Sequence, residues 1–328
     1  MAAALQQFTT MPDSSVLIGD EGGLRAILGA LRAPLATGCT LAVVVATAGS
    51  TYRKTGALIL LPQQGARIGW LSGGCLEAEL EQAAADVAAE GRARHLRFDT
   101  RGDDDLIFGS ASGCRGVAEL LLLPLAEAAP LLAALRSLDQ GGGLQLSMRA
   151  DGSGEATNGA LQWRWAATAP PSATSWSLYL AAPRRLLLLG AGPETRPLLQ
   201  LTRLLGWRTD VVETRARWFA TLVAADTHHT DLDALTRQPR FDAAVVMSHH
   251  YSRDRDFLGY CAASTIPWIG LLGPIARRDA LLAELDASAR ERLLPRLQAP
   301  VGLRLGGDGP EAIALAIIAA LQSQGLSA

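Results

Sequence analysis

The sequence predicts an α/β protein with two parts. We expect an N-terminal α/β domain with a mixed sheet, followed by a C-terminal Rossmann-like domain with a doubly wound parallel sheet. Three observations lead to this expectation. The chain has 328 residues, more than one hydrophobic core usually holds. Its first half combines apolar strand patterns with one long amphipathic helix pattern. Its second half opens with a strand, a glycine turn, a helix and a second strand, which is how doubly wound domains begin.

The N-terminal domain is predicted to span residues 1–140. The strand at 41–49 is apolar and β-branched, the strand at 116–125 is leucine-rich, and the long helix has one apolar stripe closed by Gly91. Its expected elements are a helix at 20–32, a strand at 41–49, a hairpin at 57–71, a helix at 75–91, and strands at 95–101 and 116–125.

Two further segments complete the predicted chain. Residues 141–183 are rich in glycine, proline and serine around short strand-like pieces, and we predict a hairpin-bearing linker. The Rossmann-like domain is predicted at 184–328, because strands and helices alternate there as in a parallel sheet. After its opening unit, the later strands of this domain are expected within 242–250, 264–273 and 301–307.

Composition argues against nucleic acid and membrane partners. Hydrophobic residues make up 49% of the chain, charged residues 19%, and the formal net charge is -2. The start of the chain lacks the basic region of a secretory signal, and no apolar run approaches the roughly 18 residues of a membrane span. The four cysteines are too scattered for a disulfide framework. We therefore expect a reduced, cytoplasmic protein.

The segment GAGPET at 190–195 is a variant of the dinucleotide fingerprint. Gly190 and Gly192 stand where a tight turn and a close phosphate approach require glycine, and Pro193 suits a first helical turn. The third glycine is replaced by threonine. Glu213 ends the second strand about 20 residues on, where an acidic residue can bind a ribose hydroxyl. The turn either binds a nucleotide or only begins a Rossmann-like domain, because a fold does not dictate its ligand.

A second glycine turn, formed by Ser72, Gly73, Gly74 and Cys75, precedes the helix of the first half. Backbone N–H groups at a helix start can bind an anion or lower the pKa of a thiol. Glu77 and a second glutamate two residues on oppose this, because carboxylates disfavour another negative charge nearby. Cys75 is thus either a functional thiol or a buried structural residue, since free cysteine is often buried.

Three other places carry candidate residues. Gly113 and Cys114 repeat the glycine–cysteine pattern, but neither cysteine belongs to a C-x-x-C pair, which argues against a zinc or redox site. Arg53 lies in the basic loop YRKTG, which suits phosphate binding as well as a solvated turn. His249 follows a later strand, at the carboxyl end where doubly wound sheets bind ligands. The histidines are too scattered to assign a metal ligand.

Together these motifs resemble the xanthine dehydrogenase accessory protein family, the XdhC/CoxI family. The resemblance covers most of the chain from about Leu41 onward. Four positions depart from the usual family pattern: Ser248 stands for a threonine, Pro274 for a serine and Glu213 for an aspartate, and Arg115 lies in the glycine-rich cysteine loop. The runs that carry it occur in family order: ATAGSTYRKTGALILL with GWLSGGCLEAEL, FGSASGCRGVAELLLLPL, RLLLLGAGPETRPLLQLTRLLGW with DVVETR, and VVMSHHYSRDRDFL with PWIGLLGP and APVGLRLGGDGPEAIALAI.

The resemblance implies an accessory factor and not a metabolic enzyme. Family members bind the molybdenum cofactor, a molybdopterin with or without a dinucleotide extension, and protect it while a cysteine desulfurase partner helps to sulfurate it. They pass it to a molybdenum hydroxylase apoenzyme of the xanthine or aldehyde dehydrogenase type, and they tend to be homodimers. The motifs and the basic loop together give these expected cofactor contacts: Arg53, Ser72, Gly73, Gly74, Cys75, Glu77, Gly113, Cys114, Gly190, Gly192, Pro193, Glu213 and His249.

Two other functions stay open at this point. The chain could be an NAD(P)-dependent oxidoreductase that uses GAGPET and Glu213, with His249 as its acid/base candidate. It could also be a sulfurtransferase that carries a persulfide on Cys75.

Overall fold

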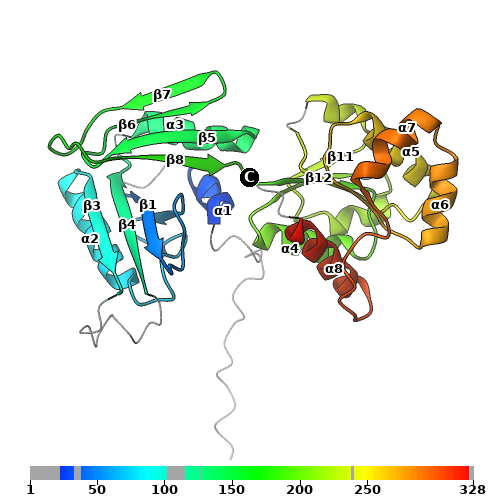
Figure 1. Cartoon of the computed structure of the whole chain (residues 1–328), viewed down its shortest axis with the longest axis horizontal. Coiled ribbons are helices and arrows are strands. Elements are labelled where there is room, and N and C mark those ends of the chain that lie inside the picture. The colour runs from blue at the N-terminus through cyan, green and yellow to red at the C-terminus, as the bar shows by residue number, and fades with distance from the viewer. Residues whose placement is uncertain (1–22, 33–37, 102–114, 127, 238–239, 325–328) are drawn as a thin grey trace, which may run out of the picture.

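The computed structural model of the chain describes residues 23–32, 38–101, 115–126, 128–237 and 240–324. Figure 1 shows two halves side by side, the N-terminal half in blue to green and the C-terminal half in yellow-green to red. The fold is α/β, and the C-terminal half is the Rossmann-like parallel domain that the sequence predicts.

The N-terminal half is built on a four-stranded sheet with the strand order β2-β1-β4-β3. All of its described pairings are antiparallel, so the expectation of a mixed sheet is wrong. The reason is the path of the chain: helix α2 (Glu77–Glu90) connects the two edge strands, which do not pair with each other, and so creates no parallel neighbours. The strands are β1 (Thr40–Gly49), β2 (Leu58–Leu61), β3 (Arg94–Asp99) and β4 (Gly116–Pro124).

Both faces of this sheet are buried. In β1, Ala42 and Val44 belong to the core under α2, whereas Val43 and Val45 belong to the core on the opposite face. This alternation follows from the two-residue period of a strand. Helix α2 buries Leu80 and three other stripe residues against the sheet and ends, as predicted, at Gly91 with a left-handed φ of 65°.

Residues 141–183 form more than the expected linker. They contain a four-stranded antiparallel sheet with the order β7-β6-β5-β8. Its buried side chains share one core with β1, β4, α1 (Gly23–Ala30) and α3 (Ala129–Ser137). This sheet is therefore a structural layer of the N-terminal half. Its strands are β5 (Gly143–Arg149), β6 (Gly154–Asn158), β7 (Leu161–Trp165) and β8 (Ser175–Ala181).

The C-terminal half contains a six-stranded parallel sheet with the order β11-β10-β9-β12-β13-β14. Because β10 and β12 flank β9 on opposite sides, the strand order reverses between β9 and β12, which is where doubly wound sheets bind ligands. The strands are β9 (Arg185–Leu189), β10 (Arg208–Val212), β11 (Thr227–His229), β12 (Ala243–Val246), β13 (Ile269–Leu271) and β14 (Leu297–Gln298).

Helices cover both faces of the parallel sheet. One face packs against α4 and α8, which lie side by side in Figure 1, and the other packs against α5, α6 and α7. Among the described residues, no helix combines the length and the apolar character that crossing a membrane requires. The helices are α4 (Thr195–Leu204), α5 (Tyr251–Ala263), α6 (Ile275–Ala283), α7 (Ala287–Leu293) and α8 (Pro310–Ser323).

The predicted strand at 301–307 is wrong. The sixth strand, β14, ends at Gln298, before this segment begins. Within the segment, Gly302, Gly306 and Gly307 have φ values of 105°, 83° and 83°. These left-handed conformations cannot continue a strand, so the glycines end the apolar pattern as a loop.

A partly buried cluster of charges joins the two halves. Arg25 of α1 donates to the carbonyl oxygen of Trp207 at 2.6 Å and pairs with Asp226 at 2.7 Å. Arg208 pairs with Asp226 at 3.1 Å and also with Asp139, which follows α3. Removing one partner would leave a buried charge uncompensated, so the cluster fixes how the halves meet.

Candidate functional site

The SGGC turn borders a cavity of about 350 Å³ in the N-terminal half. Four segments of the chain enclose it: residues 50–53 after β1, residues 71–76 ahead of α2, the end of β3 and the start of β4. The side chains of Phe98 and two leucines make its floor apolar. A volume of this size is within the range of small-molecule sites, about 300–1,000 Å³. The lining residues are Ser50, Thr51, Tyr52, Arg53, Leu71, Ser72, Gly73, Cys75, Leu76, Phe98, Thr100, Gly116 and Ala118.

A buried pair, Ser72 and Glu77, fixes the shape of this turn. Glu77 Oε1 accepts from the N–H groups of Leu71 and Ser72 at 3.1 and 2.8 Å, and Oε2 accepts from the Ser72 hydroxyl at 2.5 Å. The Ser72 hydroxyl oxygen accepts from the N–H groups of Gly74 and Leu76 at 3.1 and 3.2 Å. Burial alone would raise the pKa of Glu77, but the hydrogen bonds from Ser72 and Leu71 outweigh it and lower that pKa. The carboxylate is thus held ionised as a structural acceptor.

The same turn leaves a thiol and two backbone donors available. In the part of the chain that the structure describes, the N–H groups of Gly73 and Cys75 have no hydrogen-bond acceptor. The Cys75 side chain is exposed, and its Sγ lies 3.5 Å from Ser72 Oγ. Gly74 has a φ of 119°, a conformation that a residue with a side chain rarely adopts. Because these groups sit at the start of α2, the positive end of the helix dipole adds to their attraction for an anion.

Arg53 brings an uncompensated positive charge to the cavity. It is half-buried, lines the cavity, and forms no ion pair with any described residue. Its carbonyl oxygen accepts from the Thr51 hydroxyl at 2.8 Å, which helps to fix the loop. A guanidinium without a carboxylate partner suits a phosphate or another anion in the cavity.

The predicted residues of the first half divide into three groups. Arg53, Ser72, Gly73 and Cys75 line the cavity. Gly74 and Glu77 belong to the turn but do not line it. Gly113 and Cys114 lie outside the described residues. Sequence reasoning missed the lining residues Tyr52, Phe98 and Thr100, although YRKTG had marked the loop that contains the first of them.

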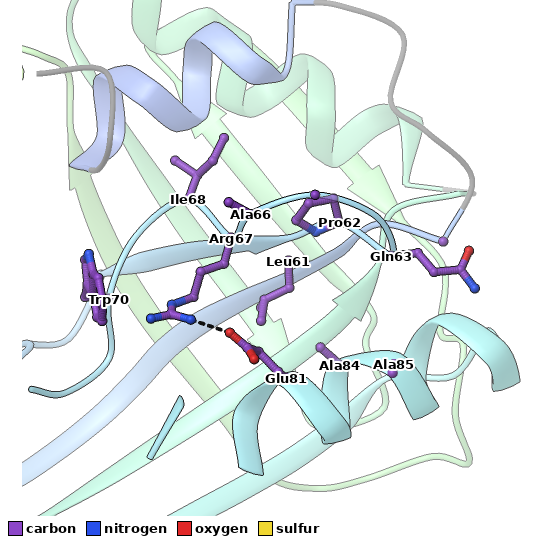
Figure 2. A pocket seen from close by; sticks show the side chains of 12 residues that line it. Leu61, Pro62, Gln63, Ala66, Arg67, Ile68, Trp70, Glu81, Ala84 and Ala85 are labelled. Carbon is purple, nitrogen blue, oxygen red and sulfur yellow. Dashed lines mark hydrogen bonds and ion pairs between the residues drawn. The ribbon is translucent and has the colours of Figure 1, made fainter. Parts of the chain in front are cut away.

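A larger cavity of about 670 Å³ lies between the loop after β2 and helix α2. Figure 2 shows Arg67 pointing at Glu81, with which it forms an ion pair, and Trp70 beside it. The Arg67 guanidinium carbon lies 4.2 Å from the Trp70 ring centroid. This cavity contains none of the predicted residues, and its opposite charges already neutralise each other. We therefore centre the candidate site on the smaller cavity.

The predicted residues of the Rossmann half meet at the carboxyl ends of β9, β10 and β12. Gly190 has a φ of 93°, and an added Cβ would collide with the backbone of Ser248. Glu213 is fully buried and accepts from the N–H group of Ala191 at 2.9 Å. Burial alone would raise the pKa of Glu213, but hydrogen bonds and charge from Arg215 outweigh it and lower that pKa.

His249 forms a pair with Glu194, which sequence reasoning did not expect. The distance from His249 Nε2 to Glu194 Oε1 is 2.5 Å, and the hydrogen bond that the ring donates to the Glu194 carboxylate raises the pKa of His249. The Glu194 carboxylate is buried, whereas the imidazole is half-exposed. His249 also has a φ of 56°, a strained value for a residue other than glycine. Among the described residues, no three His, Cys, Asp or Glu side chains form a group that could hold a metal ion.

The expected site residues that the structure describes form two separate groups. One surrounds the cavity of the N-terminal half, and the other lies at the switch point of the parallel sheet. The lining of the cavity contains no residue of the C-terminal half among those described.

Two family models match the chain. The model of the XdhC and CoxI family matches residues 36–99, which contain the SGGC turn, and the model of the XdhC Rossmann domain matches residues 186–321. The chain belongs to the XdhC and CoxI family. The family membership that the sequence motifs suggested is therefore confirmed.

Individual relatives agree with this family. The chain is 29% identical over 305 residues to a protein of Bacillus subtilis strain 168 described as a probable subunit of xanthine dehydrogenase, covering 85% of this chain and 91% of the relative. It is 24% identical over 295 residues to the molybdenum cofactor insertion chaperone PaoD of Escherichia coli K12, covering 87% and 83%. The crystal structure of a xanthine dehydrogenase from Bacillus halodurans superimposes with a TM-score of 0.76 at 26% identity, covering 93% of this chain and 95% of that one.

Proposed function

We propose that this XdhC-family chain binds the molybdenum cofactor in the cavity beside the SGGC turn and delivers it to a xanthine dehydrogenase-type apoenzyme. One observation carries the proposal: an exposed thiol, two N–H groups and a guanidinium surround one small cavity. Neither the two N–H groups nor the guanidinium has an acceptor among the described residues. The relative PaoD, described as a molybdenum cofactor insertion chaperone, supports the same role.

The residues around the cavity fit this cargo. A molybdopterin carries an anionic phosphate, for which the N–H groups of Gly73 and Cys75 and the charge of Arg53 are suitable partners. The apolar floor formed by Leu71, Leu76 and Phe98 would exclude water from the bound molecule. The Cys75 thiol would contact or shield the metal end. In this account Ser72 and Glu77 do not contact the cargo but hold the turn in shape.

We extend the proposal to the steps around binding. On the family resemblance, the bound cofactor is sulfurated with the help of a cysteine desulfurase before transfer. The chain acts as a homodimer in the cytoplasm, and the apoenzyme that receives the cofactor is a molybdenum hydroxylase.

The test is cofactor retention followed by transfer. The chain is purified from a host that makes the cofactor, and molybdenum and pterin are measured per chain. It is then mixed with a molybdenum hydroxylase apoenzyme, whose activity is followed. We expect bound molybdenum and pterin and restored activity, with Cys75→Ala weakening retention more than Cys114→Ala. Absence of both metal and pterin, with no restored activity, would contradict the proposal.

The exposed thiol also supports a second candidate, a sulfurtransferase with a persulfide on Cys75. Incubation with a cysteine desulfurase and cysteine should then add the mass of one sulfur atom to the peptide that contains Cys75. An unchanged peptide mass would exclude this candidate and leave cofactor binding unaffected.

A further inference from the structure

The glycine turn of the Rossmann half has its binding groups occupied by the protein itself. A dinucleotide site of this type needs three things: free backbone donors for the pyrophosphate, open space over the second glycine, and an acidic side chain free for the ribose.

The backbone donors at the start of the turn are taken. The N–H group of Ala191 donates to Glu213 Oε2 at 2.9 Å, and that of Gly192 donates to Thr195 Oγ1 at 2.8 Å. Pro193 has no N–H group. Thr195 stands where the fingerprint has its third glycine. The hydroxyl that this replacement introduces is the acceptor for the N–H group of Gly192.

The space over the second glycine is also filled. A Cβ added at Gly192 would lie 2.5 Å from His249 Nε2 and 2.9 Å from Glu194 Oε1. The imidazole and the carboxylate therefore occupy the face that a phosphate would approach. A buried carboxylate there also repels a phosphate group, which leaves the N–H group of Glu194 a poor anion donor.

The acidic residue of the second strand has both oxygens engaged. Glu213 Oε1 accepts from the backbone N–H groups of Thr214 and Arg215 at 2.8 and 2.7 Å, and from Arg215 Nε at 2.9 Å. Oε2 accepts from Arg215 Nη2 at 2.5 Å in addition to Ala191. The Arg215 guanidinium further donates to the carbonyl oxygens of Ala191 and Ser248, so it ties β9, β10 and β12 together across the crevice.

We propose that Thr195, Glu213 and His249 close this glycine turn to dinucleotides, so that the turn serves the architecture of the domain and not ligand binding. NAD(P)-dependent chemistry at this turn is then excluded. If the proposed cargo carries a nucleotide extension, the extension is held outside the turn; this consequence alone rests on the proposed function.

The first test measures binding directly. The full chain without cofactor is titrated with NAD⁺, NADP⁺ and a cytidine dinucleotide by calorimetry. We expect no saturable binding tighter than about 1 mM, which corresponds to roughly -4 kcal/mol. A Kd below about 100 µM, together with slower amide exchange of Ala191 and Gly192 in the complex, would overturn the proposal.

The second test needs no ligand. Because the N–H groups of Ala191 and Gly192 are bonded internally, residue-resolved hydrogen exchange of the free chain should show both amides protected, unlike those of Gly73 and Cys75. In Thr195→Gly, the Gly192 amide should lose this protection. Fast exchange of Ala191 and Gly192 in the unmodified chain would overturn the closed turn, whatever the outcome of cofactor binding.

Discussion

The two glycine turns of this protein have similar glycine-rich sequences, but their backbone N–H groups differ in whether they are free to bind a ligand. Both precede a helix, and in both a glutamate accepts backbone N–H groups. In the SGGC turn, Glu77 accepts hydrogen bonds from the N–H groups of Leu71 and Ser72. The N–H groups of Gly73 and Cys75 have no acceptor among the described residues. In the GAGPET turn, the protein's own side chains take the donors that a ligand would need. A glycine-rich motif therefore indicates a tight turn, and only the hydrogen-bond partners show whether that turn can bind.

The largest expected effect concerns the thiol that only the first turn presents. Cys75→Ala should lower the affinity for the molybdenum cofactor at least about ten-fold, equivalent to about 1.4 kcal/mol, because the proposed contact with the metal end would be lost. Equilibrium dialysis with metal analysis measures this. Cys39→Ala is the matched control, since Cys39 is buried away from the cavity. Equal affinity of Cys75→Ala and the unmodified chain would contradict a role for the thiol.

The second effect concerns how the first turn is held open. Glu77→Ala should destabilise the N-terminal half by about 3 kcal/mol, because the Ser72 hydroxyl and two buried N–H groups lose their acceptor. Urea unfolding monitored by circular dichroism measures the loss. Glu79→Ala, an exposed glutamate on the same helix, should stay within about 0.5 kcal/mol of the unmodified chain. A similar stability for both variants would show that Glu77 does not hold the turn.

A smaller effect is expected from the charge at the rim. Arg53→Gln should weaken cofactor binding about five-fold, because one charge-assisted contact to an anion is lost at a partly solvated site. The loss should shrink as salt rises. Lys54→Gln removes an adjacent exposed charge that does not line the cavity and should change affinity little. The same loss of affinity in both variants would indicate that positive charge attracts the anionic cofactor nonspecifically and that Arg53 does not contact it.

The smallest effect concerns the His249–Glu194 pair beside the GAGPET turn and its contribution to the pH dependence of stability. Glu194 raises the pKa of His249 above 6.5, so this pair stabilises the folded state fully below that pH. The contribution is lost as pH rises through the folded-state pKa, because the folded chain then releases the proton it had held. The urea midpoint of the Rossmann half should therefore fall as pH rises from about 6.5, and Glu194→Gln should remove that part of the pH dependence. Identical pH profiles would contradict the pair.

The sequence predicted what local patterns determine. The strand, turn and helix around Gly190 and the end of α2 at Gly91 follow from short motifs, and the structure has them. The sheet at 143–181 was hidden because its strands are short, alternate with polar residues and lie between turn-rich segments. The strand predicted at 301–307 is the opposite case, because its apolar residues suggested a strand that is absent. The left-handed conformations of its glycines could not be read from the sequence.

The candidate site was predictable only in part. Arg53 and Cys75 could each be suspected from sequence, but their position around one cavity depends on how β1, β4 and α2 pack. Glu77 was expected to bind the cofactor, yet its carboxylate is buried and bonded to the turn. The pairing of His249 with Glu194 joins residues 55 positions apart, and no sequence spacing predicts such a contact.

The central claim is that the SGGC turn, and not the Rossmann turn, receives the cofactor. The most direct measurement is the rate at which iodoacetamide alkylates Cys75, followed by peptide mass spectrometry with and without bound cofactor. With cofactor at about ten times its Kd, we expect alkylation to slow about ten-fold, while buried Cys261, whose pKa burial raises to about 12, stays unreactive in both states. An unchanged rate at Cys75 in a chain that demonstrably holds molybdenum and pterin would contradict the account.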